Sequence, residues 1–275
     1  MTIENRLEIL DIDDSELLKA YFPAIQKLFI DAFGKPISKE LWEWAYVENP
    51  FGSPKVSLAF DGERLVAHYA VIPMNLSSLE TELQGFLSMT TMVASDYRRH
   101  QLFQKTAERV YARIERSQKP AVVFGFPNDQ SAPGFRKRLG WDILDDFTVV
   151  TLTPEDIPKA QDVLNIISAR SYFLNLSAKG VADWRCAKPG QEWIFREDIS
   201  IKSHGQEHDV MYIAPGCTLS GLDDLNSFNM ILPISRSQAI DAGWDNAFTY
   251  RFGYRQFNMA DKLEFNVQMC MSDVF

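Results

Sequence analysis

The stretch that decides the fold is residues 92–103, which read MVASDYRRHQLF. The uncharged residues 84–94 predict a strand, and residues 101–117 continue with helical periodicity, with one apolar and one basic stripe. A strand that turns directly into a helix leaves the first backbone N–H groups of the helix unpaired, at the positive end of its dipole. Three basic residues flank this helix start: Arg98, Arg99 and His100. The junction is therefore expected to bind an anion.

The helix is expected to link two parallel strands. Lys119-Pro120 ends it, and the continuous apolar run 121–126 predicts a buried strand. Strand, helix and strand in this order form a βαβ crossover, so its two strands should be parallel neighbours. Upstream, residues 56–60 and 65–72 flank an Asp-Gly-Glu turn and predict an antiparallel hairpin. Together these elements predict a mixed sheet of the α/β class.

The remaining elements of the first half surround this sheet. Apolar spacing from Leu17 to Phe33, with Gly34 behind it, predicts a helix, and a second short helix is expected over 39–46. A helix over 131–139 should end at Gly140, which suits the position after a helix. Another strand is expected over residues 146–152.

Prolines 154 and 158 mark an expected boundary at residues 153–158. It divides the chain into a first domain, 1–152, and a smaller α+β lobe, 153–275. The elements expected in this lobe are a helix over 157–172, strands over 191–201 and 209–213, a helix over 235–242, and tail strands over 248–257 and 262–271.

A faint internal echo relates the two halves. Leu139-Gly140-Trp141-Asp142 is similar to Ala242-Gly243-Trp244-Asp245, and Trp44 and Trp184 each precede a proline and two strands. If the halves are related, the second has lost a segment as long as the βαβ crossover. Two interpretations stay open at this point: a degenerate repeat of the first fold, and chance.

Composition restricts the class of protein. The chain has 275 residues, 46% of them hydrophobic, with 28 Lys+Arg against 37 Asp+Glu and a net charge of −9. It has no run of about 18 apolar residues that could span a membrane, and no signal peptide pattern, so we expect a cytoplasmic protein without a membrane partner. Cys186, Cys217 and Cys270 are widely spaced, which predicts neither a disulfide framework nor a metal site.

The charge is unevenly distributed. Residues 97–140 contain ten basic and three acidic side chains, a balance of +7, so the remainder of the chain carries −16. Such an island suits a bound anion, and a solvated helix face without a ligand explains it equally well. The acidic average argues against a nucleic-acid partner, and the basic stripe carries few interleaved aromatic residues.

The junction resembles motif A of the GNAT superfamily of acyl-CoA-dependent N-acyltransferases, whose pattern is Arg/Gln-x-x-Gly-x-Gly/Ala. Arg98 matches the first position, whereas Gln101 and Phe103 stand where the two small residues belong. Phe126-Pro127-Asn128 and Leu139-Gly140-Trp141 match further family positions. The resemblance covers about residues 5–152. It implies a GNAT-like mixed α/β sheet, with acetyl-CoA as co-substrate and no metal.

The resemblance also assigns site residues. The coenzyme A residues that it implies are Met92, Val93, Ala94, Arg98, Arg99, His100, Gln101, Leu102, Phe103 and Asn128. The segment that covers the acceptor in this family contains Trp44, Tyr46, Asn49 and Phe51. Aromatic faces suit stacking on sugar rings, but they equally suit the anchoring of short helices on a sheet.

Catalysis requires a base for the amine proton and an acid for the leaving thiolate. His68 is our candidate base because imidazole titrates near neutral pH; the alternative is a buried histidine with a structural hydrogen bond. The tyrosine that usually serves as acid is replaced by Arg136. His204 and His208 lie in an expected hairpin turn and do not predict a metal site.

The function that we expect is transfer of an acetyl group from acetyl-CoA to the primary amine of a small molecule, such as an amino sugar. The phrases Trp42-x-Trp44-x-Tyr46 and Asn49-Pro50-Phe51-Gly52 are similar to a longer GNAT subgroup associated with acylation of amino sugars. The alternative is a non-catalytic acyl-CoA-binding or interaction protein, because the small motif residues and the tyrosine are missing. A homodimer is an open alternative for the assembly.

Overall fold

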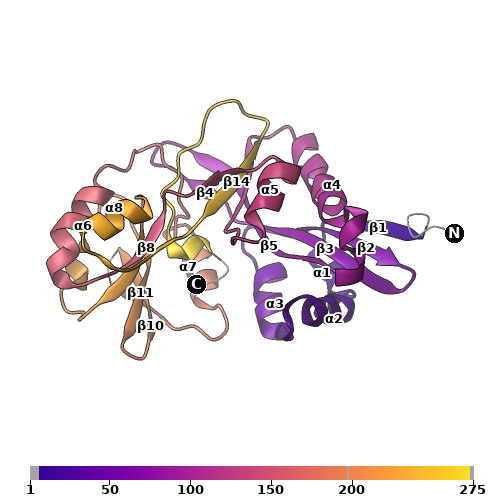
Figure 1. Ribbon diagram of the computed structural model, residues 1–275, viewed down its shortest axis with the longest axis horizontal. Coiled ribbons are helices and arrows are strands. Elements are labelled where there is room, and N and C mark those ends of the chain that lie inside the picture. The colour runs from indigo at the N-terminus through magenta and orange to yellow at the C-terminus, as the bar shows by residue number, and fades with distance from the viewer. Residues whose placement is uncertain (1–5, 197, 273–275) are drawn as a thin grey trace.

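Two mixed sheets, one in each lobe, organise the chain (Figure 1). The structure is a computed structural model that describes residues 6–196 and 198–272. The first sheet has the order β1-β2-β3-β5-β6-β14-β7. Its strands are β1 (Leu7–Ile12), β2 (Lys55–Asp61), β3 (Arg64–Pro73), β5 (Glu82–Val93), β6 (Ala121–Gly125), β14 (Phe252–Phe257) and β7 (Asp142–Leu144), and β4 (Leu76–Ser77) pairs with β5.

The predicted crossover is confirmed. β1, β2, β3 and β5 are antiparallel neighbours, whereas β5 and β6 are parallel. The helix between them is α4 (Leu102–Arg116), preceded by the 3₁₀ segment η2 (Ser95–His100). The fold class predicted from the sequence, a mixed α/β sheet, is therefore confirmed.

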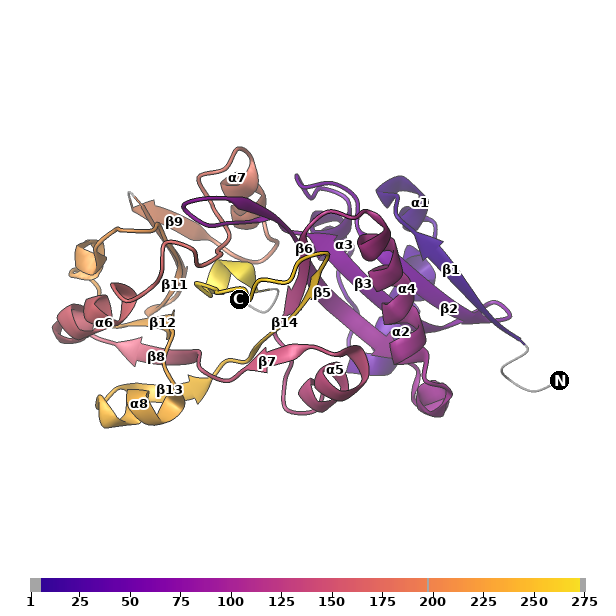
Figure 2. The same ribbon diagram turned by 90° about the horizontal axis from the view of Figure 1, so that it is seen from above.

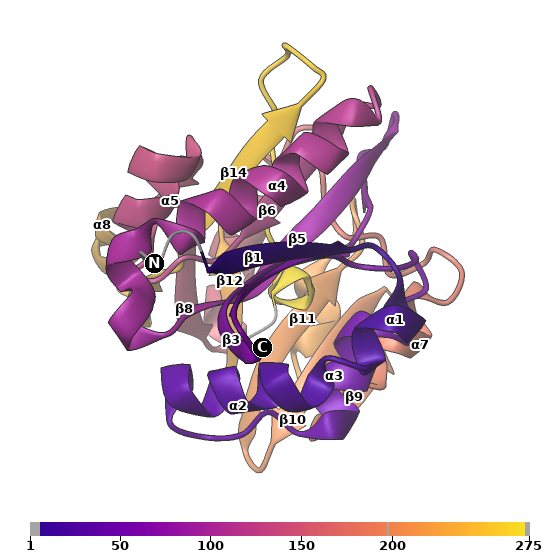
Figure 3. The same cartoon turned by 90° about the vertical axis from the view of Figure 1, so that its right-hand side faces the viewer.

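Helices cover both faces of the first sheet (Figure 3). One face carries α1 (Ser15–Lys19), α2 (Phe22–Phe33) and α3 (Lys39–Tyr46), and the other carries α4 and α5 (Ala132–Leu139). The single helix predicted over residues 17–33 is in fact two helices, α1 and α2. Pro23 lies in the first turn of α2, a position that favours the start of a helix, so the chain begins a new helix there. Gly34 and Gly140 end α2 and α5 in the left-handed conformation, as predicted.

Buried hydroxyl groups join α4 to the sheet. The hydroxyls of Tyr69 and Tyr111 are 2.7 Å apart, Trp141 Nε1 donates to Tyr111 at 2.8 Å, and Ser88 Oγ donates to Tyr69 at 3.1 Å. Burial raises the pKa of Tyr69 to about 12, so this network is uncharged at neutral pH. It fixes Ser88 on β5 near the place where β5 leaves β6.

The second sheet has the order β13-β8-β12-β11-β10-β9. Its strands are β8 (Thr148–Leu152), β9 (Trp193–Arg196), β10 (Ile199–His204), β11 (Glu207–Ile213), β12 (Phe228–Leu232) and β13 (Asp245–Thr249). Its helical segments are η3 (Pro154–Asp156), α6 (Ile157–Leu164), α7 (Val181–Cys186), η4 (Leu219–Leu222) and α8 (Arg236–Asp241). The predicted hairpin turn is confirmed, with Gly205 at φ 65° between β10 and β11.

The two sheets exchange strands (Figure 2). β8 lies between β12 and β13 in the second sheet, and β14 lies between β6 and β7 in the first. The expected lobes 1–152 and 153–275 therefore do not coincide with the sheets, since each sheet takes one strand from the other half of the chain.

The internal echo has a structural counterpart. In each lobe a strand is followed by a helix, a left-handed glycine, a tryptophan and an outer strand: β6-α5-β7 with Gly140 (φ 66°) and β12-α8-β13 with Gly243 (φ 80°). In both lobes the exchanged strand lies between these two strands. The inner strand is parallel to its other neighbour, β5 in one case and β11 in the other. The topology thus supports a degenerate repeat over chance.

Several element predictions for the second half are wrong. α6 ends at Leu164 instead of residue 172, and residues 191–201 and 248–257 each contain parts of two strands. Residues 262–271 are not a strand: their only bridge within the described chain joins Phe265 to Tyr172, and η5 (Met269–Met271) follows. The alternating apolar residues of this tail are buried between the lobes, which mimics the pattern of a strand. Edge strand β1 was not predicted, because it includes the exposed Glu8 and the half-buried Asp11.

Candidate functional site

The candidate site lies where the parallel strands β5 and β6 separate. Their pairing covers only Gln84–Leu87 against Ala121–Phe124, while β5 continues to Val93. Beyond Leu87 the two strands are no longer paired, so the end of β5 is open in the sense that its backbone has no partner in β6. Met92, Val93 and Ala94, three of the residues predicted from the sequence, lie at this open end.

A bulge distorts the part of β5 that is not paired with β6. Thr90 has a φ of 49°, and the register against β3 shifts between His68 and Ala70. His68 Nδ1 lies 2.8 Å from the carbonyl oxygen of Thr90, and Tyr46 Oη is hydrogen-bonded to Thr90 Oγ1. Two side chains from neighbouring elements therefore hold the bulge in place.

The start of α4 adjoins this open end. Gln101 precedes the helix with φ 58° and ψ 23°, a left-handed conformation that costs a non-glycine residue about 1 kcal/mol. This is the position where motif A has its first glycine, so the backbone conformation explains the family preference. The first turn of α4 contains no acidic residue, and no side chain caps it. Arg98 and Arg99 are exposed, and no ion pair to either is found in the described part of the chain.

The second replaced small residue, Phe103, points away from this junction. Its ring meets that of Phe135 on α5 edge-on, with centroids 5.3 Å apart. Leu102 is buried, and His100 lies with its ring centroid 5.8 Å from that of Tyr97. Asn128 lies in the loop between β6 and α5 and accepts hydrogen bonds from the backbone of Gln130 and Ser131, so it shapes this loop.

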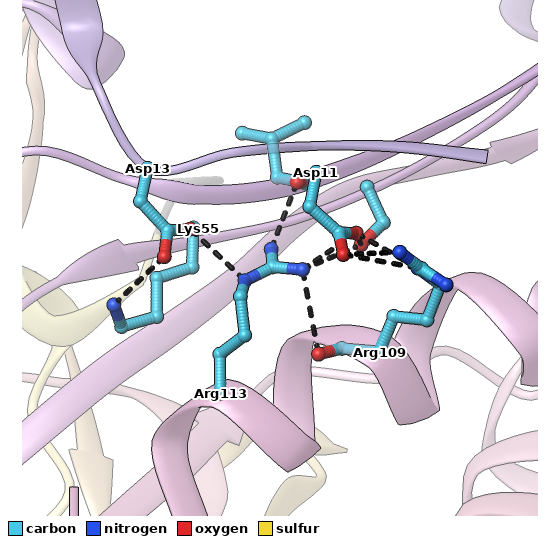
Figure 4. A network of polar contacts seen from close by, with 7 residues as sticks. Asp11, Asp13, Lys55, Arg109 and Arg113 are labelled. Carbon is cyan, nitrogen blue, oxygen red and sulfur yellow. Dashed lines mark hydrogen bonds and ion pairs between the residues drawn. The ribbon is translucent and has the colours of Figure 1, made fainter. Parts of the chain in front are cut away.

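Two members of the basic stripe of α4, Arg109 and Arg113, form ion pairs with acidic side chains at the end of β1 (Figure 4). Arg109 donates to both carboxylate oxygens of Asp11, and Arg113 pairs with Asp11 at 2.6 Å and Asp13 at 3.0 Å. Arg113 also donates to the carbonyl of Val56 at 2.8 Å. Burial alone would raise the pKa of Asp11, but these hydrogen bonds and charges outweigh it and lower the pKa. Both arginines thus attach α4 to β1 and β2, whereas Arg98 and Arg99 at the helix start are not used in this way.

His68 is buried and neutral. Its exposed fraction is 1%, and burial lowers its pKa to about 4. Because the Thr90 carbonyl can only accept, Nδ1 carries the proton. Nε2 is buried and has no hydrogen-bond partner among the described residues. The ring therefore has one satisfied and one free nitrogen, which matches neither sequence alternative fully.

The predicted acceptor residues lie near the lobe interface. Trp44 and Trp184 stack at 5.0 Å and 13°, and each indole N–H donates to the other residue's carbonyl, at 2.6 and 2.9 Å. Phe51 meets Trp184 edge-on at 6.3 Å. Asn49 donates to the carbonyl of Pro73 at 2.9 Å and accepts from the N–H of Phe51. In this structure Trp44 and Phe51 therefore pack against Trp184, and Asn49 is hydrogen-bonded to the backbone of β3. The side chain of Tyr46 is also buried, with 1% exposed.

Two further features complete the site. Arg136, at the position of the missing tyrosine, is exposed and donates to the Ile143 carbonyl at 3.3 Å. Sequence reasoning missed Arg185, which is fully buried with its guanidinium 5.1 Å from the ring of Trp44 and 5.5 Å from that of Trp184. No sequence signal beyond its neighbour Trp184 identifies it. Within residues 6–196 and 198–272, no cluster of three His, Cys, Asp or Glu side chains suits a metal ion.

Residues 15–144 match the family model described as the acetyltransferase (GNAT) domain. This part of the chain, just under half of it, is similar to the GNAT acetyltransferases. No curated protein matches the sequence. No helix of the described chain is long and apolar enough to cross a membrane.

Solved structures share the fold of both lobes. A GCN5-related N-acetyltransferase from Kribbella flavida has a TM-score of 0.61 at 10% identity and covers 94% of this chain and 73% of its own. A second GCN5-related N-acetyltransferase, from Anabaena variabilis, has a TM-score of 0.57 at 11% identity, with 90% and 72% covered. The GCN5-related glucosamine N-acetyltransferase region of a fungal multi-domain GH3 beta-N-acetylglucosaminidase has a TM-score of 0.51 at 12% identity, with 90% and 38% covered. The similarity of fold thus extends through the second lobe.

Proposed function

We propose that this protein transfers an acetyl group from acetyl-CoA to the primary amine of a small molecule, with an amino sugar as the preferred acceptor class. One observation carries the proposal: the open end of β5 lies beside the uncapped, basic start of α4. The helix start suits the pyrophosphate of coenzyme A, since its N–H groups and Arg98 and Arg99 supply donors and positive charge. The open edge at residues 92–94 suits the amide groups of the pantetheine arm.

The backbone at the start of α4 suits coenzyme A, although Gln101 stands where the family has a glycine. The left-handed conformation at residue 101 aims the backbone as a glycine would, but the Gln101 side chain occupies space that a glycine leaves open. Its side chain is exposed, so it can move aside without disturbing the core. Acetyl-CoA supplies the activated acyl group, and the chain's own groups bind and orient it.

His68 has two candidate roles in this reaction. The base role remains a prediction from the sequence, and the hydrogen bond to Thr90 favours a positioning role. With a pKa of about 4, the ring is neutral at pH 7 but a weak base, and burial keeps it from solvent. We therefore propose that His68 holds the bulge of β5 and that the amine loses its proton to water. A pH profile of kcat/KM for wild type and His68→Asn distinguishes the roles: a positioning role lowers the rate at every pH, whereas a base role removes an ionisation.

The amino-sugar preference rests on support from two sources. The fungal region with the same fold is a glucosamine N-acetyltransferase, and the 42–52 segment resembles that of the amino-sugar subgroup. Thiol release from acetyl-CoA across a panel of glucosamine, a polyamine and an α-amino acid tests the preference. Release with glucosamine alone supports it, and release with the others alone overturns it.

Coenzyme A binding is tested by thermal shift with acetyl-CoA, CoA and 3′-dephospho-CoA, because a ligand that binds the folded state raises its stability. Replacement of Arg98 and Arg99 by alanine should weaken CoA binding at least tenfold by removing two charge-assisted contacts. Arg138→Ala, which removes an exposed arginine on α5, serves as the matched control. Equal CoA affinity in the Arg98/Arg99 variant and the control would contradict the placement of the anion site.

The non-catalytic alternative is favoured by one observation, the exposed Arg136 at the acid position. It predicts the same thermal shift with CoA but no thiol release with any amine. A measurable turnover with any acceptor overturns it.

A further inference from the structure

The second lobe contains a cavity at its own parallel strand pair. β11 and β12 pair at Asp209–Asn229 and, within the described residues, at no other position, after which they separate as β5 and β6 do. A cavity of about 280 Å³ lies at this separation, lined by Val210 and Ile213 of β11 and by Met230 and Ile231 of β12. Its location in the fold therefore corresponds to the open end of β5 in the first lobe, and Leu164 at the end of α6 also lines it.

The lining of this cavity is uncharged. Among the described residues that form it, none is Asp, Glu, Lys, Arg or His. Burial of a charged group without a partner costs several kcal/mol, so a charged ligand is disfavoured. The link from β11 to β12 also lacks a long helix, since only the short segment η4 lies there. The second lobe thus has no counterpart of the basic start of α4, the feature that suits phosphates in the first lobe.

Two neighbouring amide side chains, Asn266 and Gln268, line part of the cavity. Gln268 already pairs with β11 as an amide: its Oε1 accepts from the N–H of Ile213 at 2.6 Å, and its Nε2 donates to the Ile213 carbonyl at 3.1 Å. Asn266, two residues away and half-buried, has no side-chain hydrogen bond within the described residues. An amide that is half-buried without a partner is a donor and acceptor available to a ligand.

We propose that this cavity binds an uncharged ligand with an amide group and a short aliphatic part. Apolar side chains of both strands enclose the aliphatic part, and Asn266 pairs with the amide. N-acylation converts a cationic amine into a neutral amide, so the ligand has the chemistry of a product of the proposed reaction; this last link alone rests on the proposed function.

Three related probes of different charge test the proposal: N-acetyl-leucinamide is neutral, leucinamide without the acetyl group is a cation, and N-acetyl-leucine with a free carboxylate is an anion. Calorimetric titration of the full chain should show saturable binding of the neutral probe and at least tenfold weaker binding of both charged probes. Equal binding of the three probes, or no binding of the neutral one, would overturn the proposal.

Two variants place the binding in this cavity. Ala214→Phe, which fills the space beside β11, should abolish binding of the neutral probe, and Asn266→Leu should weaken it about fivefold. Asn226→Leu changes an exposed amide outside the cavity and should have no effect. Unchanged binding in both cavity variants contradicts the assignment. CoA binding in the same samples reports folding and tests the proposed function separately, so a chain that binds CoA but not the neutral amide overturns this inference alone.

Discussion

The two lobes share an arrangement of strands but differ in the link across their parallel pair. In the first lobe, 27 residues (94–120) connect β5 to β6 and include η2 and α4. In the second, only 14 residues (214–227) connect β11 to β12 and include η4. The basic helix start is present only in the longer link, so the proposed phosphate site depends on the crossover and not on the sheet.

The lobes also depend on each other for stability. Each sheet contains a strand from the other half of the chain, and the pair Trp44–Trp184 joins α3 to α7 through two reciprocal hydrogen bonds. Because each sheet needs a strand from the other half of the chain, we expect that neither half folds independently. The comparison therefore predicts different binding in the two lobes but a shared unfolding transition.

The largest expected effect comes from separating the halves. A chain of residues 1–152 lacks β14, which pairs with both β6 and β7, so the backbone groups of these strands lose their partners. We expect no cooperative thermal transition by circular dichroism, in contrast to the full chain. A sharp transition in the 1–152 chain would show that the strand exchange is dispensable.

Removal of one tryptophan of the pair should have the next largest effect. Trp44→Ala leaves a cavity against Trp184 and removes the indole N–H that donates to the Trp184 carbonyl, which should cost about 3–5 kcal/mol of unfolding free energy. Phe195→Ala, which truncates a half-exposed aromatic residue on β9, should cost less than about 1 kcal/mol. Urea titration measures both, and equal losses would refute the importance of the pair.

His68 predicts a pH dependence of stability. Its folded pKa of about 4 lies below the ordinary 6.5, so the unfolded chain binds more protons between these values and stability rises with pH. The contribution, about 3 kcal/mol, is fully present above pH 6.5 and is lost as the pH falls toward 4. The difference in unfolding free energy between pH 7 and 4.5 should shrink in His68→Asn. An unchanged difference would mean that another group titrates.

The network in Figure 4 should give the smallest effect. Asp11→Asn removes the partner of Arg109 and Arg113, which are partly exposed, so the expected loss is about 1 kcal/mol. CoA affinity should stay unchanged, because Arg109 and Arg113 attach α4 to the sheet and do not lie at the proposed phosphate site. A loss of CoA affinity as large as that of the Arg98/Arg99 variant would show that the whole stripe binds the anion.

The elements of the first lobe could be predicted because local signals agree there. The apolar periodicity of α4, the buried run of β6 and the glycines after α2 and α5 each identify an element without knowledge of its neighbours. The strand exchange could not be predicted, since β8 and β14 have the same apolar character in either sheet. Likewise, the tail over 262–271 looks like a strand because burial between the lobes imposes the same alternation.

The site was predictable only in part. The helix start with Arg98 and Arg99 follows from the sequence, because charge and a strand-to-helix junction are local features. The sequence gives no sign that Arg109 and Arg113 pair with Asp11 and Asp13, almost a hundred residues away. Nor does it show that Trp44 faces Trp184, which depends on the packing of the second lobe.

The measurement that tests the central claim most directly is the stoichiometry of CoA binding by calorimetry. If only the first lobe retains the phosphate-binding helix start, the full chain binds one CoA, and Arg98→Ala/Arg99→Ala weakens that binding at least tenfold. Two equivalents of CoA for each chain, or one equivalent that is indifferent to both substitutions, would contradict the account.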